Sequence, residues 1–379
     1  MKHVEVVVVG AGINGLATAL ALQERGVRSL ALLEQHRGDP SRGSSHGRSR
    51  ITRSSYSSPK YVELMQLVHE RLWPHWEQLA GTPLLHPNPG IFFGPGVDTH
   101  LHSLQAVPAA LARVEVLSPA EAARRFPPFL FGDSPRVVVD HSCAVVAAQR
   151  TREFLRQQLA GALQEGCQLL EWRAQAQHLE LHTSLGPMRC ERLILTLGPW
   201  AARQLPGLAP ALRAAHQDVA YYQLDSPMGV GQFPCWVYLG QDSFSSFYGL
   251  PEFERPGVKI AHHRTGPLAD SPERQLPDDL PAEAAATLER FIAEQWSGSP
   301  QRVGYEPCMY TNTVSEDFVL DHWPGEPRVV VGAGFSGHGF KFAPLTGQVL
   351  AELCLQGSTS LPEFEQHRHH FAWRQARPW

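Results

Sequence analysis

The chain has 379 residues, too many for one ordinary hydrophobic core, so we expect two domains. Apolar residues make up 43% and charged residues 18%, as in globular proteins, and the formal net charge of −4 argues against a nucleic acid as the main partner. No run of 18 apolar residues occurs, so we expect no membrane span.

The start of the chain, MKHVEVVVVGAG, runs directly into a glycine loop, so we interpret it as a first strand rather than a signal peptide. Six cysteines are scattered along the chain, and none forms a C-x-x-C pair, which gives no support to a zinc site or a thioredoxin-type motif. Isolated cysteines in a chain of this size are typical of a reducing compartment. The last residues, RQARPW, carry no peroxisomal S-K-L address, and we therefore expect a cytoplasmic protein.

The sequence VVVGAG occurs twice, and its first copy predicts a dinucleotide site. Gly10, Gly12 and Gly15 form a G-x-G-x-x-G motif between a β-branched run and the Ala/Leu-rich segment LATALALQERG. The next strand, SLALLE, ends in Glu34, 19 residues after Gly15, which is the spacing at which a carboxylate meets a ribose hydroxyl. We expect a pyrophosphate at the helix N-terminus, and an acid at position 34 argues against a 2′-phosphate.

The segment RGDPSRGSSHGRSRITRSSYSSPK follows this strand, and its composition alone favours a solvated linker. Its position next to the expected nucleotide favours a functional role instead. It concentrates His46, Arg48, Arg50 and Arg53, and the last two would share a face if a helix begins there. Arginines at this place are plausible ligands for a phosphate, a reduced flavin or a carboxylate. Ser45, in the same segment, is a candidate cofactor contact.

Helices are predicted at 59–79 and 148–165, and a strand at 192–197 that ends in a Gly-Pro break. The region 217–264 differs, because short aromatic-rich runs such as VAYYQL, CWVYL and VKIAHH alternate with Gly and Pro. This pattern predicts an antiparallel sheet in a second domain. A Pro-rich connection, LADSPERQLPDDLPAE, then leads to a helix that opens near Pro281.

The second glycine copy, GAGFSG, lacks the rest of a nucleotide unit. After Gly337 the chain continues with His338, Gly339 and Lys341, and the helix is expected to open only at Pro344. No strand ending in an acid follows that helix. The loop is therefore either a tight turn or a place where the backbone approaches something flat or bulky.

Several segments taken together resemble the monomeric sarcosine oxidase family, which includes pipecolate and N-methyltryptophan oxidases. They are GSSHGRSRITRSSY, YGLP, VKIAHH, CMYTNTVSEDFVLD and VVVGAGFSGHGFKF, and the likeness runs in order from the first strand to about Leu355. It implies an α/β fold, with a Rossmann-like FAD-binding domain and a second α+β substrate domain built on a mostly antiparallel sheet. The domains would comprise 1–80, 135–206 and 304–379 for FAD, and 81–134 and 207–303 for the substrate.

The resemblance implies FAD held covalently through a cysteine thioether to the flavin 8α carbon, and the matching cysteine is Cys308. From its surroundings in sequence alone, Cys308 is equally a buried core residue. Arg50 with His46 fills the place of the positive charge near the flavin. The loop of Gly337, His338 and Gly339 would pack against the isoalloxazine ring.

The resemblance also assigns substrate residues. Arg53 and Lys341 match the pair that binds the substrate carboxylate, and Tyr248 and Tyr310 match the aromatic walls. His263 matches a histidine near the amine, although it could equally be a structural residue of the sheet.

Lys259 matches the lysine at which oxygen is activated, with an exposed strand lysine as the alternative. It alternates with apolar Val258 and Ile260, which favours one strand face turned toward a cavity. Val237 departs from a position that is methionine in some sarcosine oxidases, and this position lies on the substrate side.

The predicted function is oxidation of a secondary amino acid such as sarcosine, giving an imine and hydrogen peroxide from O₂, by a monomer with no nucleic-acid or membrane partner. Alternatives are an oxidase of pipecolate, proline or N-methyltryptophan, an FAD-dependent dehydrogenase that uses another electron acceptor, and a non-catalytic flavin subunit.

Overall fold

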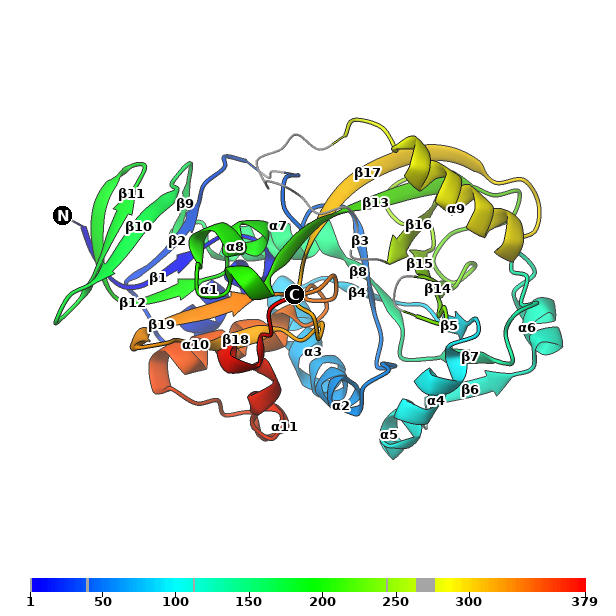
Figure 1. Cartoon of the computed structure of the whole chain (residues 1–379), viewed down its shortest axis with the longest axis horizontal. Helices are drawn as coiled ribbons and strands as arrows, with labels where there is room; N and C mark the ends of the chain where they lie inside the picture. Colours follow the sequence, from blue (N-terminus) through cyan, green and yellow to red (C-terminus); the bar gives the residue numbers. More distant parts are fainter. Residues whose placement is uncertain (1, 39–40, 112, 243–244, 264–276) are drawn as a thin grey trace.

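The computed structural model describes residues 2–38, 41–111, 113–242, 245–263 and 277–379. Two large β-sheets organise the chain, one toward each end of the molecule in Figure 1. The long strands β13 (Arg213–Gln223) and β17 (Gln301–Asn312) run side by side from the middle of the molecule into the second sheet (Figure 1). The first part of the expected Pro-rich connection, 268–276, lies outside the described residues.

The first sheet has a parallel core with an apolar cluster on each face. Val6 and Val8 of β1 belong to one cluster, and Val7 and Val9 to another, because successive strand residues point to opposite faces. The parallel strands lie in the order β9 (Leu163–Glu165), β2 (Leu30–Glu34), β1 (Lys2–Val9), β12 (Gly186–Leu195) and β19 (Glu326–Ala333). Antiparallel strands extend it: β10 (Leu169–Ala174), β11 (Leu179–Thr183) and β18 (Val319–Trp323).

Two helices with glycine motifs before them pack together on this sheet. Helix α1 (Ile13–Glu24) follows β1, and α10 (Ala343–Gln356) follows β19, with Pro344 in its first turn as predicted. A Cβ on Gly347 would lie 2.6 Å from the carbonyl carbon of Ala17, so a glycine is needed where the two helices touch. This contact brings both glycine loops to the same edge of the first sheet (Figure 1).

The second sheet is antiparallel except for one pair, β14 with β5, which confirms the predicted mostly antiparallel domain. Its eight strands lie in the order β17, β13, β16 (Val258–His263), β15 (Ser246–Leu250), β14 (Cys235–Tyr238), β5 (Gly90–Phe93), β7 (Val137–Asp140) and β6 (Val114–Leu117). Helix α9 (Ala282–Gln295), which begins next to Pro281 as predicted, covers one face.

The alternation of side chains gives this sheet two different faces. On the α9 face, Phe93, Trp236 and Ile260 form an apolar core with Phe291 of the helix. The residues between them in each strand point the other way, and we call that side the cavity face. It carries Phe92, Val237, Tyr248, Lys259, His263, Tyr221, Val219, Glu306, Cys308 and Tyr310.

The remaining elements connect the sheets. A small sheet consists of β3 (Ser49–Thr52), β8 (Ala144–Ala147) and β4 (Leu85–Pro87). The helices are α2 (Pro59–Leu67), a π-helical turn (Val68–Leu72), α3 (Trp73–Ala80), α4 (Val97–Gln105), α5 (Pro108–Leu111), α6 (Pro119–Arg125), α7 (Ala148–Gln158), α8 (Ala201–Gln204) and α11 (Pro362–Glu365). In the part of the chain that the structure describes, no helix combines the length and apolarity needed to cross a bilayer.

Three sequence-based expectations need correction. Arg50 and Arg53 do not start a helix, because 49–52 is strand β3, paired with β8. The helix expected to reach 165 ends at Gln158, where the chain turns into β9. The strand expected at 192–197 is the end of the longer β12.

The proposed domain boundaries at 135 and 304 cut through the second sheet, since β7 and β17 belong to it. The division into an FAD domain and a substrate domain itself stays a prediction.

Candidate active site

A cavity of about 750 Å³ extends from the first glycine loop to the cavity face of the second sheet. Except for Arg48, the site candidates from the sequence all line it, although they come from distant parts of the chain. They are Gly10, Gly12, Gly15, Glu34, Ser45, His46, Arg50, Arg53, Tyr248, Lys259, His263, Cys308, Tyr310, Gly337, His338, Gly339 and Lys341. Arg48, from the same arginine-rich segment, is exposed and lies outside the cavity wall.

The first glycine loop is a cradle in which Gly10 and Gly15 tolerate no side chain. Gly10 has φ +97°, and a Cβ on Gly15 would lie 1.8 Å from the carbonyl oxygen of Gly10. Helix α1 begins after Gly12 without a side-chain cap. The loop is held from two sides, because Ala11 N–H donates to Glu34 Oε2 (3.0 Å) and Ile13 N–H donates to Ser45 Oγ (3.0 Å).

The wall beyond this loop includes residues that sequence reasoning missed. Arg152 of α7 is buried, and burial followed by the nearby Arg156 lowers its pKa to about 10. Trp200 and Gln168 also line this end. No local sequence motif predicts a role for these residues. They line the cavity only because the fold brings α7, the segment after β9 and the turn after β12 beside it.

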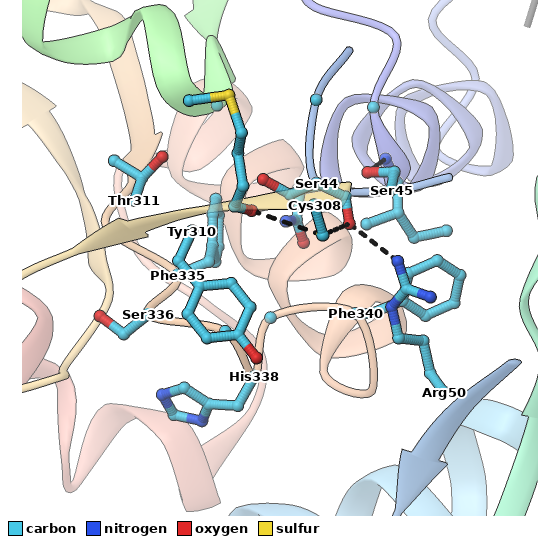
Figure 2. Close-up of a pocket in the computed structure, with 18 of the residues that line it drawn as sticks. Ser44, Ser45, Arg50, Cys308, Tyr310, Thr311, Phe335, Ser336, His338 and Phe340 are labelled. Atoms are coloured by element: carbon cyan, nitrogen blue, oxygen red, sulfur yellow. Dashed lines mark hydrogen bonds between the residues drawn. The ribbon is translucent and has the colours of Figure 1, made fainter. Parts of the chain in front are cut away.

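The second glycine loop packs against β17. Ser336 N–H donates to the Thr311 carbonyl (2.9 Å), and a Cβ on Gly337 would lie 2.4 Å from the ring of Tyr310. Ser336 itself has φ +45°, an uncommon conformation for a residue with a side chain. Figure 2 shows the loop residues Phe335, Ser336 and His338 around Tyr310. The loop therefore brings its backbone close to the cavity wall that carries Cys308.

Cys308 lies buried beside a fixed cation. Its Sγ is 3.9 Å from the Ser44 carbonyl, to which Arg50 Nη2 donates (3.0 Å), as Figure 2 shows. Burial raises the pKa of the Cys308 thiol, and Arg50 and Lys259 oppose that shift. Arg50 also donates to the carbonyls of His46 (2.5 Å) and Ser49 (2.8 Å), which fix its guanidinium.

His46 lies in the same wall as Arg50, and its expected role near the flavin stays a prediction. Its Nε2 donates to the Pro307 carbonyl (2.7 Å), and burial, followed by Arg50, lowers its pKa below the ordinary histidine value. This shift disfavours the charged imidazole, whereas Arg50 and Lys259 both act on the Cys308 thiol as positive groups.

Arg53 and Lys341 form a second cationic pair. The Arg53 guanidinium lies 4.3 Å from the centre of the Tyr56 ring and 5.2 Å from that of Phe92, and its buried Nη1 has no hydrogen-bond partner. Lys341 Nζ donates to Tyr56 Oη (3.1 Å). Burial, then the charge of Arg53, holds the pKa of Lys341 well below its ordinary value. Two buried basic side chains, one of them with an unused donor, favour binding of an anion.

A buried polar network fixes the segment that carries Arg53. The imidazole of His69 contacts Thr52 Oγ1 (2.6 Å) through Nε2 and Ser54 Oγ (3.2 Å) through Nδ1. Asp140, at the end of β7, accepts hydrogen bonds from Ser55 N–H (3.0 Å) and from its hydroxyl (2.5 Å). The residues on both sides of Arg53 are therefore anchored, which predetermines where its guanidinium points.

Three rings form an aromatic wall beside this pair. The hydroxyls of Tyr248 and Tyr310 lie 3.2 Å apart, and the His263 ring centre is 6.1 Å from that of Tyr248 and 5.7 Å from that of Tyr310. Burial, followed by Lys341 and Arg53, lowers the pKa of His263 to about 4, so its imidazole is neutral at pH 7. Val237 faces the same space, opposite Tyr248 in the sheet register.

Lys259 is buried on the cavity face, with Val258 and Ile260 in the apolar core behind it, as the alternation in the sequence predicts. Its Nζ donates to the Ser49 carbonyl (3.1 Å). Burial, then Arg50, lowers the pKa of Lys259 to about 7. Its ammonium charge is therefore sensitive to its neighbours at neutral pH.

Comparison with known proteins agrees with this geometry. Residues 5–353 match the family of FAD dependent oxidoreductases. The chain belongs to this family. The peroxisomal sarcosine oxidase of Homo sapiens is 34% identical over 365 residues, covering 93% of this chain and 92% of that protein. The monomeric sarcosine oxidase of Streptomyces avermitilis is 31% identical, covering 94% and 95%. The resemblance to sarcosine oxidases is thereby confirmed.

Solved structures give the same fold. NikD, described as an unusual amino acid oxidase essential for nikkomycin biosynthesis, superposes with a TM-score of 0.82 at 23% identity, covering 98% of both chains. The L-proline dehydrogenase of P. horikoshii superposes with a TM-score of 0.81 at 17% identity, covering 99% of this chain and 98% of that one. At these identities the likeness shows the fold of an FAD-dependent oxidoreductase and nothing finer.

The cavity fits FAD on observations of this chain alone. The cradle of Gly10 and Gly15 leaves room for a pyrophosphate at a helix N-terminus whose cap residue, Gly12, has no side chain. Farther along, Arg50 and Lys259 offer positive charge where electrons would enter a ring system.

Proposed function

We propose that this enzyme holds FAD covalently through Cys308 and oxidises secondary amino acids such as sarcosine, with O₂ as electron acceptor. The observation that carries the proposal is the pair Arg53 and Lys341, two buried basic side chains with an unused donor beside an aromatic wall, in the same cavity as the glycine cradle. When bound, FAD would take a hydride equivalent from the carbon next to the substrate nitrogen and return two electrons to O₂ as hydrogen peroxide.

In this proposal the chain's residues position the substrate. Arg53 and Lys341 bind its carboxylate, and the pre-anchored Arg53 segment limits the freedom lost on binding. The same two charges lower the pKa of the substrate ammonium, which favours the free amine that must react. Tyr248 and Tyr310 would bound the amine side, with neutral His263 as a hydrogen-bonding partner. The product imine hydrolyses in solution.

Two residues are proposed to serve the flavin. Cys308 Sγ would form the thioether, and Arg50 would stabilise the negative charge that the ring gains during attachment. Lys259 would stabilise the superoxide that forms as oxygen takes up an electron. His46 contributes to this region as a neutral donor fixed on Pro307.

The proposal is tested by a peroxide assay with sarcosine, N-methyl amino acids, proline and pipecolate, run beside acid precipitation of the protein. We expect peroxide from at least one secondary amino acid and a yellow pellet. If the amino acid substrate leads to reduction of an artificial electron-acceptor dye but to no hydrogen peroxide, the enzyme is instead a dehydrogenase. A yellow protein that no amine bleaches anaerobically would contradict an enzymatic role in amine oxidation.

A cyclic or bulkier substrate is the second candidate. Val237 fills less of the wall opposite Tyr248 than the methionine of some sarcosine oxidases, which favours a larger amine substituent. Higher kcat/KM for pipecolate or proline than for sarcosine would select it.

A monomeric state and a cytoplasmic location are also proposals. They are supported respectively by the name of the monomeric relatives and by the scattered cysteines. Light scattering of the holoenzyme and cell fractionation test them.

A further inference from the structure

Glu306 on β17 brings a carboxylate into the part of the cavity wall that carries Arg50 and Lys259. It is largely buried and lines the cavity with Arg50, Lys259 and His46. Its carboxylate is 3.7 Å from Arg255 Nη1 and 4.0 Å from His46 Nε2. A buried carboxylate needs partners of this kind, and none of the functions proposed above uses it.

The sheet register sets Glu306 and Lys259 on the same face. Lys259 on β16 pairs with Tyr221 on β13, and Glu306 on β17 pairs with Val219 two residues earlier. Residues two apart in a strand share a face, so Lys259, Tyr221 and Glu306 project together from three adjacent strands. Tyr221 Oη donates to Glu306 Oε2 (2.7 Å) and fixes the carboxylate there.

Two further contacts show that the position of the carboxylate is built into the fold. Arg255 lies 4.0 Å over the Tyr221 ring and donates to the Tyr305 carbonyl (3.1 Å), which holds it behind Glu306. On the other side, Gly47 has φ +92°, and a Cβ there would lie 2.9 Å from Glu306 Oε1. Residue 47 must therefore be small where the carboxylate approaches the segment of His46 and Arg50.

We propose that Glu306 is a positioning residue of the oxygen half-reaction, whose carboxylate is the counter-charge that keeps Lys259 protonated and limits the positive potential at the flavin ring. This inference rests on the proposed function of Lys259.

The sign of each effect follows from the charges around Lys259. Burial, Arg50 and Arg255 disfavour its ammonium form, whereas Glu306 favours it. Although burial opposes it, Lys259, with Tyr221, His46 and Arg50, holds the pKa of Glu306 below its ordinary value, so the carboxylate is charged at neutral pH. Removing that charge lowers the pKa of Lys259 and makes the cavity more positive.

The test uses Glu306→Gln holoenzyme. We expect a more positive flavin reduction potential, measured against reference dyes, because a more positive cavity favours added electrons. We also expect slower reoxidation by O₂ after photoreduction. The pH above which the reoxidation rate falls should be lower than in wild type. Above that pH, each unit of displacement reduces the protonated Lys259 about tenfold.

Two further variants separate charge from structure. Glu306→Asp keeps the charge. Its flavin reduction potential and the pH above which its reoxidation rate falls should therefore lie near the wild-type values. Arg255→Met should move both in the opposite sense, and it remains informative if Glu306→Gln fails to fold. An unchanged potential with an unchanged pH midpoint, or the same displacement in the Gln and Asp variants, would overturn the proposal. Both readouts need no amino-acid substrate, so they are independent of whether any amine is oxidised.

Discussion

Replacing Arg53 by methionine tests the proposed carboxylate site most directly. Methionine keeps the apolar contacts with the rings of Tyr56 and Phe92 but removes the charge and the buried unpartnered Nη1. A desolvated charge pair of this kind contributes about 2–5 kcal/mol when one partner is truncated. Carboxylate ligands should therefore bind about 30- to 4,000-fold more weakly.

The fold should tolerate the change. Because Arg53 Nη1 has no partner and Lys341 lies close by, removing the guanidinium relieves repulsion rather than breaking a bond. The melting temperature without ligand should stay near that of wild type. The pKa of Lys341 should rise toward its ordinary value, which partly compensates for the lost charge and places the expected loss of affinity below the upper limit.

The assay is titration of the oxidised holoenzyme with a small carboxylate that lacks an oxidisable amine, followed by the change in flavin absorbance. Arg48→Met is the matched control, since Arg48 lies in the same segment but is exposed outside the cavity wall. Equal affinity in wild type and Arg53→Met would refute the assignment. Equal weakening in both variants would show that only the general charge of the segment matters.

The other predictions concern the flavin. Cys308→Ala should yield a colourless pellet after acid precipitation. A yellow pellet from this variant would show that the flavin is not attached through Cys308. Lys259→Met should slow reoxidation by O₂ by orders of magnitude more than anaerobic bleaching by substrate, whereas equal losses in both half-reactions would contradict its role. Gly15→Ala should abolish flavin binding, because its Cβ would lie 1.8 Å from the carbonyl oxygen of Gly10. Stoichiometric flavin in that variant would contradict the proposal that this glycine loop binds the cofactor.

The first nucleotide-binding unit could be predicted almost completely from the sequence because its determinants are local. The strand, the glycine loop, the helix and the strand ending in Glu34 follow one another within 34 residues, and each has its own composition. The alternation around Lys259 was also sufficient, since a strand with one apolar face leaves the other face for a cavity.

The conformation of the arginine-rich segment could not be predicted because its partner is distant. Strand β3 forms only because β8 lies beside it, and Asp140 at the end of β7 anchors Ser55, just beyond Arg53. The local spacing of Arg50 and Arg53 fits a helix equally well, so tertiary pairing decided the outcome. Glu306 was not predicted for a related reason. Its position two residues before Cys308 indicates no role by itself, because its neighbours Tyr221 and Lys259 come from the distant strands β13 and β16.

The two cationic groups of the cavity differ in how their charge is balanced, and this difference bears on their roles. Near Lys259, Glu306 supplies a fixed carboxylate, so the region can remain charged without a ligand. Around Arg53 and Lys341, no salt bridge within 4.0 Å joins either cation to an acid among the described residues. While no counter-ion is bound, burial and repulsion from Arg53 disfavour the ammonium form of Lys341, and a bound anion relieves this repulsion. The same repulsion disfavours a substrate that brings its own positive charge deep into the pocket, and it therefore favours amines that enter with the carboxylate leading and the nitrogen deprotonated.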